Sequence, residues 1–464
     1  METADVLGVH QVEEMKHLFD HQLYALACME YNPQMGVFFP PGGGKTAVAF
    51  TWIRDALRSG KIKDALVICP ASLVPNWEKD IAEATDFDHI TEDDVRLLQE
   101  KVTIRSFQKM YQTLRRTVHH RDGFDETVRK RTIRPDLDKP WGAIIIDESH
   151  GIGSYKSQQT KAAIALAGTT GYRYVMTGTP IHGSTRSGGP DYSKLYGQFK
   201  FLFPNIWSSW SAFCREYVTS WTEYKAPAAY NAEKLNKLML DHSITIRLRD
   251  CIDLPDATES VIPCLLAENK VYKEIKEHKL EKYGLDNPKS IFGKLLQVCS
   301  GSLINEKGTQ ILSTSKDDVL KDIIDGTDDK IVVFCRFTAS IDRCAEVCRR
   351  AGVGFLTFDG RSNGPVWREF DRPQYQVIIC QYQSGGAGLN LQMANTMVFF
   401  EPCFSTTDWK QTHSRIERPG QTKKMRYICL TTPKTVEDKV LKSVMSGISV
   451  TDKMIEGWVL NNEL

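Results

Sequence analysis

The sequence contains no long apolar run, and no uninterrupted stretch approaches the roughly 20 residues that a membrane-spanning helix requires. Residues 1–20 carry acidic side chains and lack the apolar core of a secretion signal. No low-complexity tract is present, and the chain is 41% hydrophobic and 25% charged, a balance that excludes extended disorder. These absences predict a globular protein of the cytoplasm.

The sequence also lacks paired cysteines. Its 12 cysteines are scattered, and no C-x-x-C pair occurs, which argues against a zinc site. Several of them lie in apolar runs, where cysteine packs as a small hydrophobic residue. We therefore expect buried free thiols in a reducing compartment. The clearest cases are Cys69, Cys335, Cys380 and Cys429.

An excess of charge of one sign is missing as well. The formal net charge is only +1, so any nucleic acid must be held by local charge and not by the overall field of the protein. The length of 464 residues is too great for one ordinary core. It predicts two or three domains of about 150 residues each.

Short apolar runs rich in β-branched residues alternate with amphipathic stretches. This rhythm is typical of parallel sheets with crossover helices. The runs form two series separated by the middle of the chain, and they predict two α/β lobes. The runs are residues 36–39, 65–69, 101–104, 143–146 and 172–176, then 331–334, 354–358, 376–380, 396–400 and 426–430.

The two series predict the domain boundaries. We place the first lobe at residues 1–250, with a helical insertion at about 190–250. The second lobe is expected at residues 251–464, with a helical segment at about 265–305. Leu254 and Pro255 interrupt the periodicity, and they predict a hinge between the lobes.

An aromatic stripe occupies the expected helical insertion. Its rings recur every three or four residues, which predicts that all of them lie on one helical face. Burial of that face is the first interpretation, and a base-stacking surface is the alternative. The rings belong to Trp207, Trp210, Phe213, Tyr217, Trp221 and Tyr224.

A basic run at residues 115–134 lies between two expected strands of the first lobe. It has two interpretations. It is either a phosphate-binding loop or a solvated charged face.

A glycine-rich segment provides the first chemical motif. Gly42, Gly43 and Gly44 precede Lys45 and Thr46, between a short apolar run and an amphipathic pattern. Glycines let backbone N–H groups approach phosphate oxygens, and the following helix N-terminus adds partial positive charge. Lys45 then reaches the β and γ phosphates, and Thr46 ligates Mg²⁺. The segment therefore predicts a site for ATP and Mg²⁺.

Two acidic residues directly follow the apolar run at 143–146. We expect Asp147 to ligate the metal ion and Glu148 to orient or deprotonate the attacking water. Either acid alone is a routine strand-end residue, but the pair downstream of a phosphate loop predicts a catalytic site. The turn from Thr177 to Pro180 follows the next strand, and it is expected to couple the γ-phosphate region to the other lobe.

The motifs, together with further segments at 21–22, 67–77, 103–107, 333–337 and 385–392, resemble the Swi/Snf-type branch of the superfamily 2 helicase-like ATPases, in a compact viral or bacterial form. The resemblance implies two RecA-like lobes, each a parallel sheet flanked by helices, with helical insertions between them. It also implies nucleotide contacts from Gln22, which would read adenine, and from Gly386. The residues that it implies for nucleic-acid contact are Ser72, Ser106, Arg336 and Asn390.

The most specific resemblance lies at residues 408–421, which are similar to motif VI of that branch. It implies that Arg415 and Arg418 point from the second lobe toward the triphosphate. Guanidinium groups placed there neutralise charge on the γ-phosphoryl oxygens, but only when the lobes are closed. A solvated pair of arginines is the alternative.

The chain departs from the branch in two loops. Phe39 stands where the strict phosphate-loop pattern has glycine, and Pro40 and Pro41 follow it. Gln381, Tyr382 and Gln383 stand in the stretch ahead of the motif V glycines where serine or threonine is usual. Neither departure removes a charged catalytic group.

The resemblance implies an ATP-dependent translocase that steps along duplex DNA through backbone contacts with little sequence preference. The chain ends at Leu464, soon after motif VI. We expect a compact motor that works with replication, repair or recombination proteins, in a bacterial cell or in the cytoplasm of a virus-infected host. The alternatives are a strand-separating helicase, a catalytically silent DNA-binding clamp, and a P-loop kinase, which would have no use for the two arginines.

Overall fold

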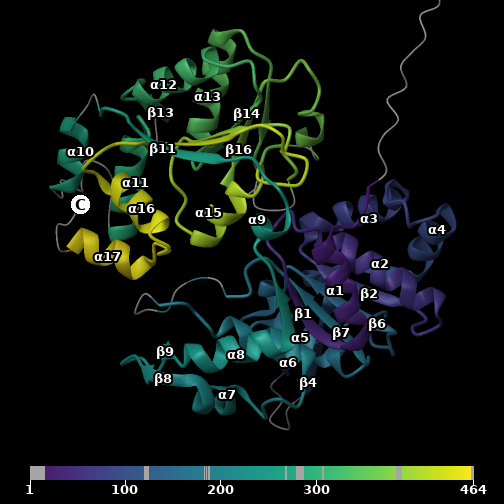
Figure 1. The fold of residues 1–464 in the computed structure, drawn as a ribbon. Helices are drawn as coiled ribbons and strands as arrows, with labels where there is room; N and C mark the ends of the chain where they lie inside the picture. The colour runs from purple at the N-terminus through teal and green to yellow at the C-terminus, as the bar shows by residue number, and fades with distance from the viewer. Residues whose placement is uncertain are drawn as a thin grey trace, which may run out of the picture.

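Two six-stranded sheets, one in each half of the chain, organise the molecule (Figure 1). All pairings within both sheets are parallel. This architecture confirms the predicted two-lobed α/β fold. The computed structural model describes residues 16–119, 125–181, 183, 185, 189–266, 269–277, 287–305, 308–362, 364, 366–382 and 389–460.

The first sheet has the strand order β10-β1-β7-β6-β2-β3. Two neighbouring inner strands, β6 and β2, are fully buried, which is why they read as continuous apolar runs. Alternate residues of β2 enter two different cores, with Val67 on one face of the sheet and Leu66 on the other. The strands are β1 (Gln34–Phe38), β2 (Ala65–Cys69), β3 (Val102–Ser106), β6 (Ala143–Asp147), β7 (Tyr172–Met176) and β10 (Ser243–Thr245).

Helices cover both faces of the first sheet (Figure 1). Two of them bear on the site. Helix α2 follows the phosphate loop, and α3 follows the short 3-10 turn η1 (Ala71–Leu73). The helices are α1 (Asp20–Tyr31), α2 (Lys45–Arg58), α3 (Val74–Ala82), α4 (Glu92–Lys101), α5 (Gln158–Ala167), α6 (Lys194–Leu202), α7 (Trp210–Tyr217) and α8 (Ala232–His242).

The second sheet has the strand order β11-β18-β17-β14-β16-β15. Strand β14 divides its side chains between two cores in the same way, with Phe334 on one face and Val333 on the other. The strands are β11 (Ala257–Pro263), β14 (Ile331–Cys335), β15 (Phe355–Phe358), β16 (Val377–Gln381), β17 (Thr396–Phe399) and β18 (Met425–Thr431).

The helices of the second lobe include those of the segment expected at about 265–305. The described part of that segment contains two helices followed by a small antiparallel pair, β12 (Ser302–Asn305) and β13 (Gly308–Ile311). No helix in the described part of the chain is long and apolar enough to cross a bilayer. The helices are α10 (Asn269–Lys276), α11 (Pro288–Cys299), α12 (Ser315–Asp325), α13 (Thr338–Ala351), α15 (Thr406–His413), α16 (Val436–Met445) and α17 (Asp452–Leu460).

The connection between the sheets runs from Thr245 to Ala257 and contains the short helix α9 (Leu248–Cys251). Figure 1 places α9 between the purple-to-teal first lobe and the green-to-yellow second lobe. The boundary expected at residue 250 falls within α9. The expected hinge residues, Leu254 and Pro255, follow α9 directly.

The prediction that all six aromatic rings share one helical face is wrong. Helix α7 ends at Tyr217, and the chain continues as the strand β8 (Val218–Trp221), which pairs with β9 (Pro227–Tyr230). The β-branched residues after Tyr217 favour a strand. Trp221 is 52% exposed, outside the buried cluster formed by the earlier rings.

The basic run is not a loop over most of its length. The described parts of it belong to two antiparallel strands, β4 (Tyr111–His119) and β5 (Asp125–Ile133), which form a ribbon beside the first sheet. Polar and apolar residues alternate only weakly there, so the pattern did not predict a strand.

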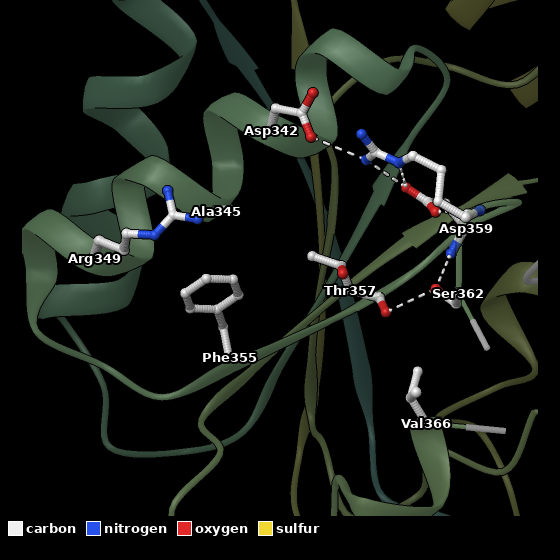
Figure 2. A pocket seen from close by; sticks show the side chains of 9 residues that line it. Asp342, Ala345, Arg349, Phe355, Thr357, Asp359, Ser362 and Val366 are labelled. Carbon is white, nitrogen blue, oxygen red and sulfur yellow. Dashed lines mark hydrogen bonds and ion pairs between the residues drawn. The ribbon is translucent and has the colours of Figure 1, made fainter. Parts of the chain in front are cut away.

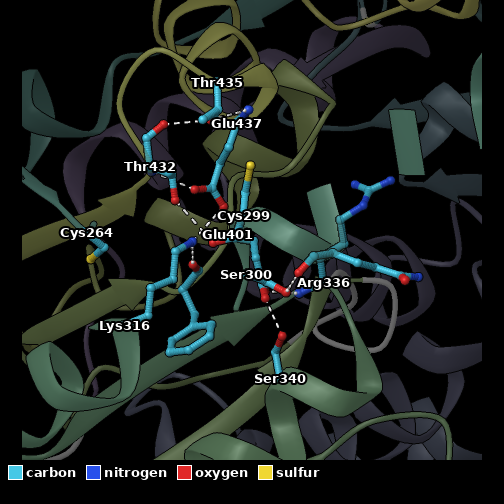
Figure 3. A network of polar contacts seen from close by, with 12 residues as sticks. Cys264, Cys299, Ser300, Lys316, Arg336, Ser340, Glu401, Thr432, Thr435 and Glu437 are labelled. Carbon is cyan, nitrogen blue, oxygen red and sulfur yellow. Dashed lines mark hydrogen bonds and ion pairs between the residues drawn. The ribbon is translucent and has the colours of Figure 1, made fainter. Parts of the chain in front are cut away.

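A buried polar network ties the elements of the second lobe together (Figure 3). Lys316 on α12 is 2% exposed, and its Nζ lies 2.6 Å from Glu437 Oε1 on α16 and donates to Phe400 O at 2.6 Å. Glu401 accepts hydrogen bonds from Ser340 Oγ and, at 2.9 Å, from the backbone N of Arg336. The network thereby anchors the segment that carries Arg336.

We expect Lys316→Met to lower the free energy of unfolding by about 3–5 kcal/mol, because it leaves Glu437 as an unpaired buried charge. Denaturant titration measures the loss. The matched control is Lys321→Met on the same helix, whose partner Asp325 is 48% exposed, and it should cost less than about 1 kcal/mol. Equal losses for the two variants would contradict the role assigned to the network.

Candidate active site

The predicted phosphate loop lies between β1 and α2. Gly42 and Gly44 adopt left-handed backbone conformations, with φ of 84° and 76°. A Cβ added at Gly44 would lie 1.8 Å from Gln22 Nε2, and one at Gly43 would lie 3.0 Å from Phe39 Cβ. Only glycine fits this part of the loop. The backbone therefore carries no Cβ atoms at these glycines, where a phosphate group would approach it.

Lys45 and Thr46 begin helix α2. The ammonium group of Lys45 donates to Phe39 O at 3.0 Å and to Pro40 O at 3.5 Å, which holds it over the loop. Thr46 is half-buried in the first turn of the helix. The helix N-terminus, the ammonium group and the glycines have the chemistry to bind a polyphosphate.

Asp147 ends β6 and is held at both carboxylate oxygens. Oδ2 accepts a hydrogen bond from Trp77 Nε1 at 2.9 Å, and Oδ1 accepts one from the backbone N of Glu148 at 2.8 Å. Burial and then the charge of Glu148 raise the pKa of Asp147, and Lys45 only partly opposes them. A buried carboxylate in this electrostatic setting is stabilised by an added cation.

These donors fit Mg²⁺. Magnesium is usually held by one or two carboxylates together with substrate phosphates, not by a protein cage. The described residues contain no cluster of three or more His, Cys, Asp and Glu side chains that could hold a metal alone. The Asp147 carboxylate and the Thr46 hydroxyl are the donor types that would hold Mg²⁺ together with phosphate oxygens.

Glu148 adopts a left-handed conformation with φ of 47°, which is costly for a residue other than glycine and is typical of functional sites. Its Oε2 accepts a hydrogen bond from Thr177 Oγ1 at 3.1 Å and lies 3.2 Å from His150 Nδ1. Burial raises the pKa of Glu148, but His150 and Lys45 outweigh burial and lower it to about 2. The carboxylate is therefore ionised at neutral pH.

The turn after β7 packs against the phosphate loop. Thr177 is fully buried, and its hydroxyl accepts a hydrogen bond from the backbone N of Thr179 at 3.1 Å. A Cβ at Gly178 would lie 2.8 Å from Pro41 Cδ. The turn expected to couple the γ-phosphate region to the other lobe thus contacts both Glu148 and the phosphate loop.

Arg415 and Arg418 bring the second lobe to this site. The side chain of Arg418 lies 3.1 Å, at its Cγ, from the position of a Cβ on Gly42. Its Nε donates to Ser414 O at 3.0 Å. Burial and then the like charge of Arg415 lower the pKa of Arg418 to about 9, against the opposing charge of Asp80 on α3.

Arg415 is 4% exposed, and its Nη1 donates to Leu389 O at 3.5 Å. Burial lowers its pKa to about 10, against the opposing charge of Glu148. Both guanidinium groups therefore remain positive at neutral pH. Both arginines belong to the second lobe, but carboxylates of the first lobe partly oppose the lowering of their pKa values.

Two polar contacts join the lobes near the arginines. Arg249 Nε on α9 lies 2.7 Å from Glu417 Oε1, in the segment between the two arginines. Arg368 Nη2 donates to Asn76 Oδ1 on α3 at 3.5 Å. The segment that carries the arginines is thus tied to the connection between the lobes.

Gln22 lies beside the phosphate loop. It is 4% exposed, its Oε1 accepts from the backbone N of Phe19 at 2.9 Å, and its Nε2 donates to Gly43 O at 3.4 Å. The neighbouring His21 Nε2 lies 3.1 Å from the same carbonyl oxygen. Gly386, the other predicted nucleotide contact in the second lobe, lies outside the described residues.

The four predicted nucleic-acid contacts differ in accessibility. Ser72 is exposed in η1, whereas Ser106 is only 5% exposed at the end of β3. The guanidinium carbon of Arg336 lies 3.5 Å from the ring centroid of Phe404, and burial lowers the pKa of Arg336. Asn390 Oδ1 accepts from the backbone N of Gln392 at 3.5 Å. Ser72 is the most exposed of the four.

A separate cavity of about 520 Å³ lies at the edge strand β15 (Figure 2). Arg361 connects two of its acidic residues: its Nη2 donates to Asp342 Oδ1 at 2.9 Å and to Asp359 Oδ2 at 2.6 Å. None of the predicted site residues lines this cavity.

The fold and the site are those of a two-lobed, helicase-like ATPase. The chain belongs to the SNF2-related family. The family model of the SNF2-related domain matches residues 28–324, and that of the helicase conserved C-terminal domain matches residues 315–420. The resemblance inferred from the motifs is confirmed.

The two curated relatives named here are each 23% identical to this chain over the aligned residues. The SWI/SNF chromatin-remodeling complex subunit snf22 of Schizosaccharomyces pombe is 23% identical over 98% of this chain and 29% of its own length. An uncharacterized ATP-dependent helicase of Mycoplasma genitalium is 23% identical over 94% of this chain and 41% of its own length. The chain spans only 25% to 33% of three such relatives.

The Sulfolobus solfataricus SWI2/SNF2 ATPase core in complex with dsDNA is 20% identical, with a TM-score of 0.41, and the match covers 97% of this chain and 96% of that chain.

Proposed function

We propose that this chain hydrolyses ATP where its two lobes meet and uses the cycle to translocate along duplex DNA. The observation that carries the proposal is the approach of Arg418 to Gly42. It places the aliphatic part of an arginine side chain of the second lobe against the phosphate loop of the first. Hydrolysis would then require the lobes to close. Closing and opening during each ATP cycle would move one lobe relative to the other.

Each residue has a role in the proposed reaction. The amides of the glycine loop and Lys45 bind the β and γ phosphates, while Thr46 and Asp147 hold Mg²⁺, which supplies charge neutralisation. Glu148 orients the attacking water and accepts its proton. The two arginines stabilise the charge on the γ-phosphoryl oxygens in the transition state.

The nucleic-acid partner is supported by the relatives. They include a probable ATP-dependent DNA helicase of Arabidopsis thaliana and a DNA repair and recombination protein of Saccharomyces cerevisiae, which are 22% and 23% identical to this chain. With a net charge of +1, the chain would hold DNA through local backbone contacts near Ser72, Arg336 and Asn390. Repair or recombination proteins are the partners that we propose.

We expect duplex DNA to stimulate ATP turnover more than single-stranded DNA or RNA does, because both lobes would grip one continuous duplex. The logarithm of the binding constant for DNA should fall linearly with the logarithm of the salt concentration, because binding releases counterions. Turnover assays with the three nucleic acids measure the preference. Stronger stimulation by RNA would contradict the proposal, and strand displacement would favour a helicase over a translocase.

We expect Lys45→Ala to lower ATP turnover by about 100- to 1,000-fold, the usual loss for one preorganised donor to a reacting phosphate or oxyanion. DNA affinity should stay within about twofold of the original, because Lys45 faces the loop and not the proposed DNA contacts. Turnover and DNA binding are measured on the same preparation. Lys61→Ala, at an ion pair with the half-exposed Glu30, serves as the control.

A further inference from the structure

Trp77, the last residue of the segment at 67–77 that resembles the family, contacts the proposed catalytic pair. Its ring is 1% exposed in α3, and its Nε1 donates to Asp147 Oδ2 at 2.9 Å. The indole N–H is a donor only, so it can hold the carboxylate but cannot replace it as a ligand. Because the ring is buried, its position is fixed by the packing of α3.

A neutral donor is suited to this place. It orients the carboxylate without adding a positive charge that would compete with a divalent cation. The other oxygen, Oδ1, is held by the backbone N of Glu148 at 2.8 Å. The orientation of Asp147 therefore depends on two hydrogen bonds, and only the one from Trp77 comes from a different element of the fold.

Helix α3 also contacts the second lobe, and it directly follows one of the proposed DNA contacts. Asn76, next to Trp77, accepts the hydrogen bond from Arg368 at 3.5 Å. The exposed Ser72 lies in η1, directly before the helix. Because Trp77 Nε1 donates to Asp147, a small displacement of α3 would also displace the Asp147 carboxylate.

We propose that Trp77 is a positioning residue, which orients Asp147 to ligate Mg²⁺ and transmits the position of α3, set by DNA and by the second lobe, to the metal site. The inference rests on the proposed function and names a part of its regulation. Partners of metal-ligating carboxylates usually matter about 10- to 100-fold for metal affinity or activity when they are removed.

Trp52 provides the matched control. It lies on α2 in the same lobe and is 2% exposed, so replacing it with phenylalanine costs similar packing. Its Nε1 makes no hydrogen bond within the described part of the chain. Trp77→Phe and Trp52→Phe therefore differ chiefly in whether the lost N–H faced a carboxylate.

The experiment measures binding of a fluorescent, non-hydrolysable ATP analogue as a function of Mg²⁺ concentration, with and without duplex DNA. For Trp77→Phe we expect half-saturation at about 10- to 100-fold more Mg²⁺, unchanged binding in the presence of a chelator, and a weaker response to DNA. Trp52→Phe should match the unaltered protein. An identical Mg²⁺ dependence for all three proteins would overturn the inference.

Nuclear magnetic resonance of the indole N–H groups tests the same inference without mutation. Addition of Mg²⁺ with the analogue should shift the Trp77 signal more than the Trp52 signal, and an unmoved Trp77 signal would contradict the inference. Lys45→Ala in the binding assay separates the two ideas. If Lys45→Ala binds the analogue normally, the site itself is wrong, whereas normal behaviour of Trp77→Phe alone removes only the role of Trp77.

Discussion

Arg418→Ala is expected to lower ATP turnover by about 10³- to 10⁵-fold, the range attributed to arginines that complete a phosphoryl-transfer site. The reason is geometric. Arg418 reaches the phosphate loop from the second lobe, and alanine removes the only part of that side chain able to meet a γ-phosphoryl oxygen. Binding of ATP should change far less, because the first lobe supplies most of the ground-state contacts.

The measurement is steady-state turnover with saturating duplex DNA, together with the affinity for the ATP analogue. Arg372→Ala is the control, because Arg372 belongs to the same lobe but is 57% exposed and pairs with Glu369. A loss below tenfold for Arg418→Ala would mean that the second lobe does not complete the site.

Glu148→Gln is expected to lower turnover by about 10²- to 10⁴-fold while ATP still binds. The amide keeps the size of the side chain but cannot accept the proton of the attacking water. The proposal assigns this step to Glu148 because its strained backbone holds the carboxylate beside Thr177 and His150. Glu100→Gln, at an exposed ion pair with Lys101, is the control.

The pH dependence gives an independent check on the same residue. The pKa of Glu148 is lowered to about 2, so its basic form is present at every pH above that value and is lost only as the pH falls through it. Turnover should show no acidic limb from Glu148 between pH 5 and pH 9. An acidic limb that disappears specifically in Glu148→Gln would contradict the assignment.

The sequence predicted the strands that are buried on both faces. Strand β2 reads as a continuous apolar run because both of its faces lie in cores. The edge strand β11 escaped prediction because it is exposed over most of its length and carries Glu259 and Ser260 among its apolar residues. Strand β10 is only three residues long. The half-buried edge strands β3 and β15 were also predicted, because they are rich in β-branched and aromatic residues.

The proposed catalytic groups were predictable where the sequence directly around them carries the signal. Lys45 and Thr46 follow the glycines directly, and Asp147 ends an apolar run, so local sequence reveals each of them. Trp77 was missed because its contact with Asp147 joins residues 70 positions apart. No spacing rule connects the two residues. The packing of α3 against the end of β6 creates the contact.

The central claim is that arginines of the second lobe face the triphosphate bound by the first. A crystal structure of the protein with Mg²⁺, ADP and aluminium fluoride tests it most directly, because the fluoride mimics the transferred phosphoryl group. Our account predicts the guanidinium groups of Arg415 and Arg418 within hydrogen-bond distance of the fluoride atoms. A structure in which the fluoride contacts only residues of the first lobe would contradict it.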